Sequence, residues 1–361
     1  MAAITYKCPN CGGELIFDPE TQKYGCEYCR SQFSQEELEE LSGKENENED
    51  REEEQGEAEN AALYTCPSCG AQIVTDETTA ATFCYYCHNP VVLSGRLSGE
   101  FRPDLVIPFQ IDRKKAKEIF EQWVGRKKFV PDGFCSEGNV ETMTGVYYPY
   151  WMYSCHVSGT LEGQGTSVSQ TTMGNTRITT TRIYAVNRSG ETDIQGLLRS
   201  ALKKGDRNLA EGVQPFETEK AREFSMGLLS GFQAEKRDME SNQFSQEAGR
   251  EVEEFFLDGL KSQGGAYSSF QVTGSQVRRD QEKWSYALLP VWTLTYRDKG
   301  SGRIYYFALN GQTGKTCGCL PVDKGKLAIL FAAVFFPVLI FMLIVGLSLI
   351  HISEPTRLQL I

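Results

Sequence analysis

The chain has 361 residues and a formal net charge of −11, so it is long enough for two or three domains, and its charge disfavours a nucleic-acid partner. The charge is concentrated, because residues 36–60 contain thirteen Asp or Glu against Lys44 and Arg51, and the rest of the chain is formally neutral. Nucleic-acid-binding proteins generally carry clustered Lys and Arg, which this balance does not supply.

A repeated cysteine motif lies near the start of the chain. Tyr6-Lys-Cys-Pro-Asn-Cys-Gly is followed by Cys26-Glu-Tyr-Cys29, and Tyr64-Thr-Cys-Pro-Ser-Cys-Gly is followed, at the same spacing, by Cys84-Tyr-Tyr-Cys87. Each Cys-x-x-Cys turn presents two thiolates, and two facing turns complete a tetrahedron of sulfurs suited to zinc. We predict two structural zinc ions, one bound by Cys8, Cys11, Cys26 and Cys29, and the other by Cys66, Cys69, Cys84 and Cys87.

Three other uses of these cysteines stay open. Disulfides need an oxidising compartment, and we expect no cleavable signal peptide before Cys8. Tetrahedral sulfur also suits iron, and thiol exchange normally uses one Cys-x-x-Cys beside a βαβ unit. Four protein ligands leave no position for a catalytic water, so we expect the metal to stabilise the fold. We also expect loss of Cys8 or Cys66 to unfold only its own ribbon.

The pattern predicts zinc ribbons at residues 1–34 and 64–96, each with short strands, such as those at 14–18 and 72–76. Between them, residues 35–63 form an acidic linker. Its first residues, after the capping box Ser34-Gln-Glu-Glu37, suit a short helix. Beyond Ser42 the segment has almost no apolar residues, so we expect a disordered, solvated spacer.

Residues 100–323 predict an α+β domain with an antiparallel sheet, so that the whole chain is a multi-domain protein. We expect strands at 105–109 and 146–153, a helix from Asp112 to Gly125, and a long hairpin turning at 173–175. Aromatic residues on strands mostly pack in cores, so we assign those of residues 146–153 to the core and not to a ligand cleft.

The second half of this domain repeats the pattern. Helical spacing occurs within residues 217–239 and again after Ser245, residues 201–214 suit a surface loop, and strands follow at 286–296 and 304–309. Tyr148-Pro-Tyr-Trp151 and Leu289-Pro-Val-Trp292 each head a predicted strand downstream of a helix. We therefore predict a duplicated helix-then-hairpin unit.

Residues 327–346 are uninterrupted by charge and long enough, at about 1.5 Å per residue, to span the bilayer as a single helix. Lys324 and Lys326 stand just before this span, and by the positive-inside rule everything N-terminal to it lies in the cytoplasm. Residues 347–361 resemble an in-frame translation of a transposon adapter used for sequencing libraries. We expect them to be an artefact and the natural chain to end near Gly346.

Motifs for catalysis are missing from the sequence. It contains no glycine-rich phosphate loop before a helix, no Gly-x-Ser-x-Gly elbow and no His-Glu-x-x-His helix, and we expect no enzymatic activity. A third metal or redox site is conceivable if Cys155 and His156 meet Cys317 and Cys319, whereas isolated reduced thiols are the simpler interpretation for these residues and for Cys135.

The pattern Tyr-x-Cys-Pro-x-Cys-Gly with a distant Cys-x-Tyr-Cys resembles the zinc ribbon of transcription-factor-IIB type. The ribbons, Gln214-Pro-Phe216, the Leu-Pro-Val-Trp strand, Ala308-Leu-Asn-Gly-Gln-Thr-Gly314 and one membrane helix together resemble the bacterial membrane-anchored TFIIB-type zinc-ribbon-containing proteins. This resemblance implies the fold and the metal, but no known reaction. We expect an adaptor module that faces the cytoplasm and binds an unidentified protein partner, with nucleic-acid binding as the alternative.

Overall fold

The computed structural model describes residues 3–4, 6–42, 61–65, 72–76, 79–83, 90–93, 97, 101–131, 134, 143–203, 207–263, 267–297 and 304–353. The strands of the N-terminal part are β1 (Ala3–Ile4), β2 (Leu15–Asp18), β3 (Lys23–Cys26), β4 (Gln32–Phe33), β5 (Ala61–Thr65), β6 (Gln72–Asp76), β7 (Thr79–Phe83) and β8 (Pro90–Leu93). Later strands are β9 (Leu105–Val106), β10 (Thr144–Met173), β11 (Thr176–Ser200), β12 (Arg222–Glu223), β13 (Gln233–Glu235), β14 (Ser269–Arg297), β15 (Ile304–Asn310) and β16 (Thr316–Gly318).

The described helices are α1 (Gln35–Ser42), α2 (Arg113–Gly125), α4 (Arg207–Gly212), α5 (Ser245–Ser262) and α6 (Lys324–Ser353), with short 3-10 turns that include η3 (Thr218–Lys220) and η4 (Met226–Leu229). Two helix starts match the sequence prediction. The Asp112 carboxylate accepts a hydrogen bond from the Lys115 N–H at 2.7 Å. Ser34 and Glu37 exchange side-chain to backbone bonds of 2.7 and 3.2 Å, which confirms the capping box before α1.

One large sheet dominates the fold, with the strand order β1-β8-β7-β13-β10-β14-β15-β16; β11 pairs with β10, and β9 pairs with β12 and β14. Most pairs are antiparallel, but β10 pairs with β13, and β14 with β9, in parallel. The prediction of an antiparallel sheet is therefore wrong in this respect, because two short strands join it by crossover connections that have no local sequence signal.

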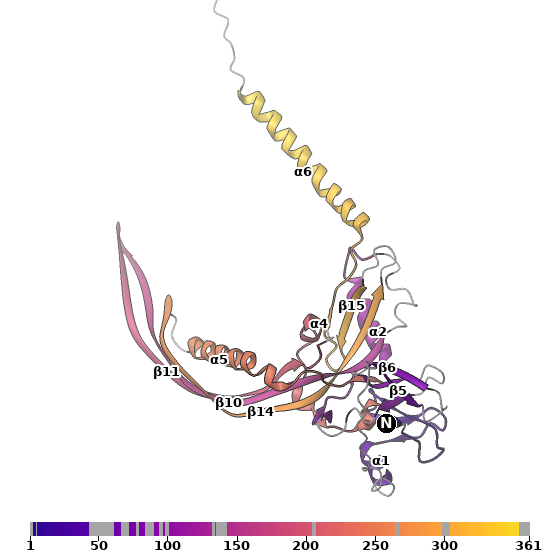
Figure 1. Ribbon diagram of the computed structural model, residues 1–361. Helices are drawn as coiled ribbons and strands as arrows, with labels where there is room; N and C mark the ends of the chain where they lie inside the picture. The colour runs from indigo at the N-terminus through magenta and orange to yellow at the C-terminus, as the bar shows by residue number, and fades with distance from the viewer. Residues whose placement is uncertain are drawn as a thin grey trace, which may run out of the picture.

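A long three-stranded arm extends from this sheet. The strands β10 and β11 form one hairpin whose last pair is Met173 with Thr176, as the turn at 173–175 predicted. Beside them, β14 pairs with β10 from Thr144 to Thr166, so the end of the hairpin continues past β14. Figure 1 shows the arm curving away from the rest of the sheet, with α5 lying along its inner side.

The two proline-tryptophan motifs lie next to each other in this sheet. Tyr147 pairs with Pro290 and Pro149 pairs with Leu288, in antiparallel register. Both motifs therefore lie inside long strands. The sequence-based prediction that each motif begins a strand is wrong. The order helix, long strand, hairpin partner does occur twice, in α2-β10-β11 and in α5-β14-β15. Duplication of an ancestral unit stays a prediction.

Alternation along β10 fills the core on both faces of the sheet. Tyr147 and Trp151 lie in the cluster that faces α2, whereas Tyr150 and Met152 lie in the cluster on the opposite face. Farther along the arm, α5 covers a third cluster with a stripe of residues spaced four apart, Ala248, Val252, Phe256 and Leu260. The assignment of the aromatic strand to the core is thus confirmed.

Residues 217–239 do not form the predicted helix. They fold as η3, η4 and two short strands, although Phe224, Leu228, Leu229 and Phe232 are all buried. The helical spacing correctly predicted which residues are buried, but not their conformation. Gly231 takes a positive φ of 91°, which does not occur within a helix. The segment packs against the cysteine module instead. Residues 201–214 likewise contain α4 and a buried Ala201, and are not simply a surface loop.

The second cysteine module shares its strands with the large sheet. The strands β5 and β6 pair only with each other among the described residues, but β7 pairs with β13, and β8 pairs with β1. The described ends of the expected acidic linker, α1 and β5, are helix and strand. The predicted disordered spacer at residues 43–60 lies outside the described residues.

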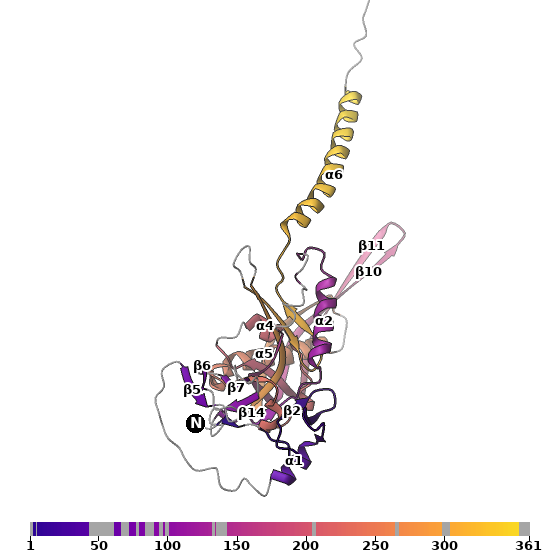
Figure 2. The same ribbon diagram turned by 90° about the vertical axis from the view of Figure 1, so that its right-hand side faces the viewer.

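Helix α6 contains the predicted span. Residues Lys324–Val345 are long and apolar enough to cross a membrane, and none of this window is buried against the protein. Figures 1 and 2 both show α6 extending away from the sheet, at the opposite end of the molecule from α1 and the N-terminus. The segment 347–361, expected to derive from an adapter, lies partly in α6 and partly outside the described residues.

Candidate metal centre

The first cysteine module folds as two facing turns. In the first, the Gly12 N–H donates to the Cys8 carbonyl at 2.8 Å, and in the second the Arg30 N–H donates to the Cys26 carbonyl at 2.9 Å. Both turns end in a residue with positive φ, 72° at Gly12 and 60° at Arg30. This shared geometry turns both pairs of cysteines toward the same point.

The four sulfurs of Cys8, Cys11, Cys26 and Cys29 all lie within 4.8 Å of one another. Cys8 and Cys29 are 3.5 Å apart at their Sγ atoms, and so are Cys11 and Cys26. A disulfide needs about 2.05 Å, whereas a tetrahedron with Zn–S bonds of about 2.3 Å has S···S edges of about 3.8 Å. The geometry therefore fits a four-thiolate metal site and does not fit disulfides.

The thiols of the cluster also influence one another's ionisation. The pKa of Cys29 is lowered to about 6, mainly by a hydrogen bond with the Ser31 side chain and secondly by one with the Ser31 backbone. The backbone of Gly13 lowers the pKa of Cys11, but bonds with Cys29 and Cys26 outweigh it and raise this pKa to about 12. The two thiols therefore titrate as a coupled pair, with pKa values shifted in opposite directions. A divalent metal bound here would hold all four sulfurs as thiolates.

The module is seated on the large domain. The Phe17 N–H donates to the Ser230 carbonyl at 3.1 Å, and the Ser230 hydroxyl donates to the Leu15 carbonyl at 2.5 Å. The Gln22 amide donates to the Phe109 carbonyl at 2.7 Å. Buried residues of the module belong to the same core cluster as those of α2 and β14: Cys8, Leu15, Phe17, Tyr24 and Cys26. The metal site and the sheet therefore share one core.

We call the contact of Leu15, Phe17 and Gln22 with Phe109 and Ser230 the seat of the module. Gly231 lies next to Ser230 in this seat. A Cβ atom built on it would lie 2.5 Å from Ile16 Cγ2, at a φ of +91°. We predict that Gly231→Ala destabilises the chain by about 2–4 kcal/mol, from the left-handed backbone and the overpacked contact, and speeds zinc release. Denaturant unfolding of the full chain in detergent, with transfer of zinc to a chelator, measures both.

Gly125→Ala serves as the control, because a Cβ atom at the end of α2 would meet nothing within 4 Å. This substitution is expected to be neutral or to stabilise the chain by up to about 1 kcal/mol. Equal zinc-release rates for the two variants would show that the module does not depend on its seat.

The second predicted metal site, Cys66, Cys69, Cys84 and Cys87, lies outside the described residues. Within the described part of the chain, the first module is the only group of three or more metal-ligating side chains of this kind. The predicted strand at 72–76 is present as β6, and β5 and β6 pair from Ala61 with Asp76 to Thr65 with Gln72.

The described residues of the conceivable third site are not brought together. Cys155 is 4% exposed in the core beneath α5, where burial raises the pKa of its thiol. His156 is hydrogen-bonded to Asp193 at 2.7 Å, which raises the pKa of the imidazole. Cys317 packs at the opposite face of the sheet, and Cys319 is exposed. Cys135 lies outside the described residues. The described members, Cys155, Cys317 and Cys319, form no disulfide.

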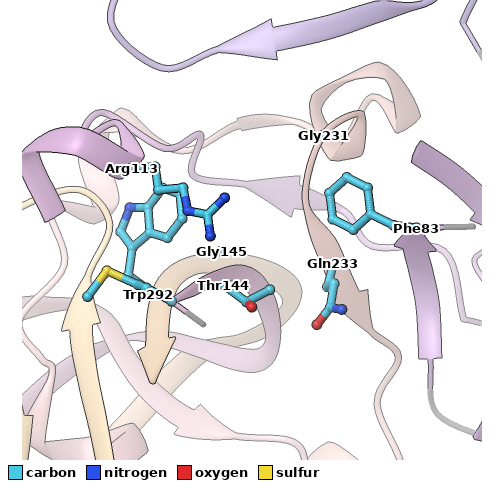
Figure 3. Close-up of a pocket in the computed structure, with 8 residues that line it drawn as sticks. Phe83, Arg113, Thr144, Gly145, Gly231, Gln233 and Trp292 are labelled. Carbon is cyan, nitrogen blue, oxygen red and sulfur yellow. The ribbon is translucent and has the colours of Figure 1, made fainter. Parts of the chain in front are cut away.

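A pocket of about 300 Å³ lies beside the seat, and the sequence did not indicate it. Figure 3 shows Arg113 and Trp292 on one side of it and Phe83 and Gln233 on the other. The Trp292 indole N–H donates to the Ile111 carbonyl at 2.9 Å, which fixes that wall. Arg113 is the one ionisable side chain in the described lining, which also contains the aromatic rings of Phe83 and Trp292. It is assembled from five separate segments of the chain, which explains why no local motif marks it.

Asn310 and Gln312, which belong to a motif of the family resemblance, are buried and form a hydrogen-bond network. The Asn310 amide donates to the carbonyls of Val213 and Pro215 at 2.9 and 3.1 Å, and its oxygen accepts from the Gln312 N–H at 2.8 Å. Gln312 in turn accepts from the Glu217 N–H at 2.8 Å. The motif around Asn310 thus holds the segment that contains Gln214-Pro-Phe216 against the end of β15.

These features define a class: a four-cysteine module consistent with a zinc ribbon, seated on a mixed-sheet domain that ends in one exposed apolar helix. The chain is 30% identical over 333 residues to YdjG, an uncharacterized protein of Bacillus subtilis (strain 168), and the match covers 92% of this chain and 94% of YdjG. The chain therefore belongs to the YdjG family. No family model matches it. No solved structure matches it either.

Proposed function

We propose that this protein is a zinc-stabilised, membrane-anchored adaptor that faces the cytoplasm and binds a protein partner through its N-terminal modules. The observation that carries the proposal is the position of the four-cysteine site. It lies at the opposite end of the molecule from α6, and its four thiolates leave no ligand position for chemistry. A metal bound by four protein ligands stabilises the fold of the module, and so its surface, and does not act on a substrate.

The proposal includes two zinc ions per chain. The first is supported by the S···S distances of Cys8, Cys11, Cys26 and Cys29. The second is supported by the identical spacing of the motif that contains Cys66 and by the β5-β6 hairpin inside it. The resemblance to TFIIB-type zinc ribbons supports the identity of the metal in both.

Anchoring through α6 is supported by its length, its apolar surface and its exposure. Lys324 and Lys326 lie at its N-terminal end, which favours placing the large domain in the cytoplasm. In this arrangement the cysteine module projects away from the bilayer, toward soluble partners (Figure 2).

A protein partner suits the module better than a nucleic acid. Lys7, Lys23 and Arg30 are outnumbered by Glu14, Asp18, Glu20 and Glu27, and a four-thiolate zinc site adds further negative charge. Tyr28 is 79% exposed, and its ring lies against Gly13 beside the sulfurs of the site. An exposed tyrosine on a rigid turn is a common anchor of protein interfaces.

The test is photo-crosslinking in cells, with a benzophenone amino acid in place of Tyr28 in the full chain. We expect a discrete, protease-sensitive adduct in the membrane fraction. The same amino acid at Tyr306, which is 45% exposed on β15 and lies outside the module, serves as the control and is expected to give no such adduct. Tyr28→Ala should keep the zinc content, because Tyr28 supplies no ligand atom to the four-sulfur site, and should no longer retain that partner when the chain is purified from membranes.

A nuclease-sensitive adduct at Tyr28 would favour the nucleic-acid alternative. An adduct of the same size from both positions would indicate non-specific capture, and would remove the support for a binding surface at the cysteine module.

A further inference from the structure

The first turn of α6 is hydrogen-bonded to the segment that follows α2. The Asp323 N–H donates to the Phe129 carbonyl at 2.7 Å, and the Lys326 ammonium donates to the Val130 carbonyl at 2.9 Å. The Asp323 carboxylate accepts from the N–H groups of Gly325 and Lys326 at 2.8 and 3.1 Å, and so caps the first turn of α6. The segment after α2 is therefore held at the level where the apolar helix begins.

A hollow of about 460 Å³ lies at this junction. Its lining includes three consecutive exposed basic residues, Arg126, Lys127 and Lys128. Its walls are apolar and include Trp123 and Val322. The Lys127 ammonium lies 5.5 Å from the centre of the Trp123 ring. The lining thus combines exposed cations with apolar side chains.

The charge at this junction is strongly one-sided. Lys324 and Lys326 add to the three basic residues of the lining, and the nearby Asp323 is occupied by its bonds to the first turn of α6. Three exposed cations beside apolar side chains match a ligand with an anionic head and an apolar body.

We propose that this hollow binds the headgroup region of an anionic phospholipid in the same bilayer that holds α6. The phosphate faces Arg126, Lys127 and Lys128, while the glycerol and upper acyl chains lie on Trp123 and Val322. The inference rests on the proposed membrane anchor, since the anchor brings the hollow to the headgroup layer. Its consequence is that lipid charge sets how the large domain lies on the membrane.

The test uses the full chain purified in a neutral detergent, titrated with phosphatidylglycerol or phosphatidylcholine and followed by native mass spectrometry. We expect the unmodified chain to retain phosphatidylglycerol in preference to phosphatidylcholine. The triple variant Arg126→Gln, Lys127→Gln, Lys128→Gln should bind phosphatidylglycerol roughly 100-fold more weakly, because each basic residue near an anionic surface contributes roughly fivefold in affinity. Zinc content and circular dichroism confirm that the variant is folded.

The matched control is Lys114→Gln, Lys115→Gln, Lys117→Gln, which removes the same charge from the other end of α2. It should bind phosphatidylglycerol as the unmodified chain does. Equal losses in both variants, no loss in either, or equal retention of the two lipids would each overturn the proposal. Full competition by inorganic phosphate would also overturn it, in favour of a soluble anion. Carbonate extraction of membranes tests the anchor separately, because lipid retention in detergent does not depend on that result.

Discussion

Replacing Cys8 with Ser is expected to lower the zinc content of the purified chain by one ion and to destabilise the large domain as well as the cysteine module. A structural zinc site contributes on the order of 10 kcal/mol of apparent binding energy at neutral pH, and three thiolates with a hydroxyl keep only part of it. Cys8 is 2% exposed and belongs to the core cluster that includes Phe109 and Trp292. Elemental analysis and denaturant unfolding of the full chain measure the two effects.

The structure changes what this substitution should do. From the sequence, loss of Cys8 was expected to unfold only its own ribbon, but the shared core and the bonds to Ser230 couple the module to the sheet. Cys319→Ser is the control, since Cys319 is exposed and lies outside the cluster. Iron in place of zinc, or a Cys8→Ser chain with unchanged metal content and stability, would contradict the prediction.

Deleting the chain from Leu327 onward is expected to move the protein from the carbonate-resistant membrane fraction to the soluble fraction. The apolar window Lys324–Val345 is 22 residues long, about 33 Å as a helix, and none of it is buried in the protein. At roughly −0.3 to −0.6 kcal/mol for each large apolar residue, such a span favours insertion by several kcal/mol. Fractionation of cells expressing the two forms measures the change.

A leucine segment of the same length in place of residues 327–345 should restore membrane retention, because only length and apolarity are required. Orientation is read from the exposed Cys319, which lies just before α6. A membrane-impermeant maleimide should label it only after the cells are opened, with Cys319→Ser as the reference. Labelling of intact cells would reverse the proposed topology, and a soluble full-length chain would rule out the anchor.

Local chemistry predicted the local features well. The Asp112 cap, the box formed by Ser34 and Glu37, and the hairpin turn near Gly174 each depend on residues within a few positions of one another. The spacing of Cys8 to Cys29 predicted a four-sulfur cluster for the same reason, since two tight turns leave few other arrangements.

Long-range packing accounts for what the sequence did not reveal. The strand β1 is two residues long and pairs with β8 about ninety residues later. So short a strand has no hydrophobic periodicity in the sequence from which this pairing could be predicted. The buried residues from Phe224 to Phe232 fit a helical spacing, but Gly231 and the seat for Ile16 decide their conformation. The pocket beside Arg113 and the hollow at the base of α6 are assembled in the same way from distant segments.

The seat also fixes an order of events during synthesis. The apolar face of the cysteine module packs against residues around Ser230, which the ribosome adds more than 200 residues after Phe17. At about 5–20 residues per second, that delay is roughly 10–40 s. During this interval zinc can already fold the nascent module, but its docking face has no native cover. Without zinc, the nascent chain would therefore expose apolar surface in two places, first on the unfolded module and later around Ser230, where the module would otherwise pack.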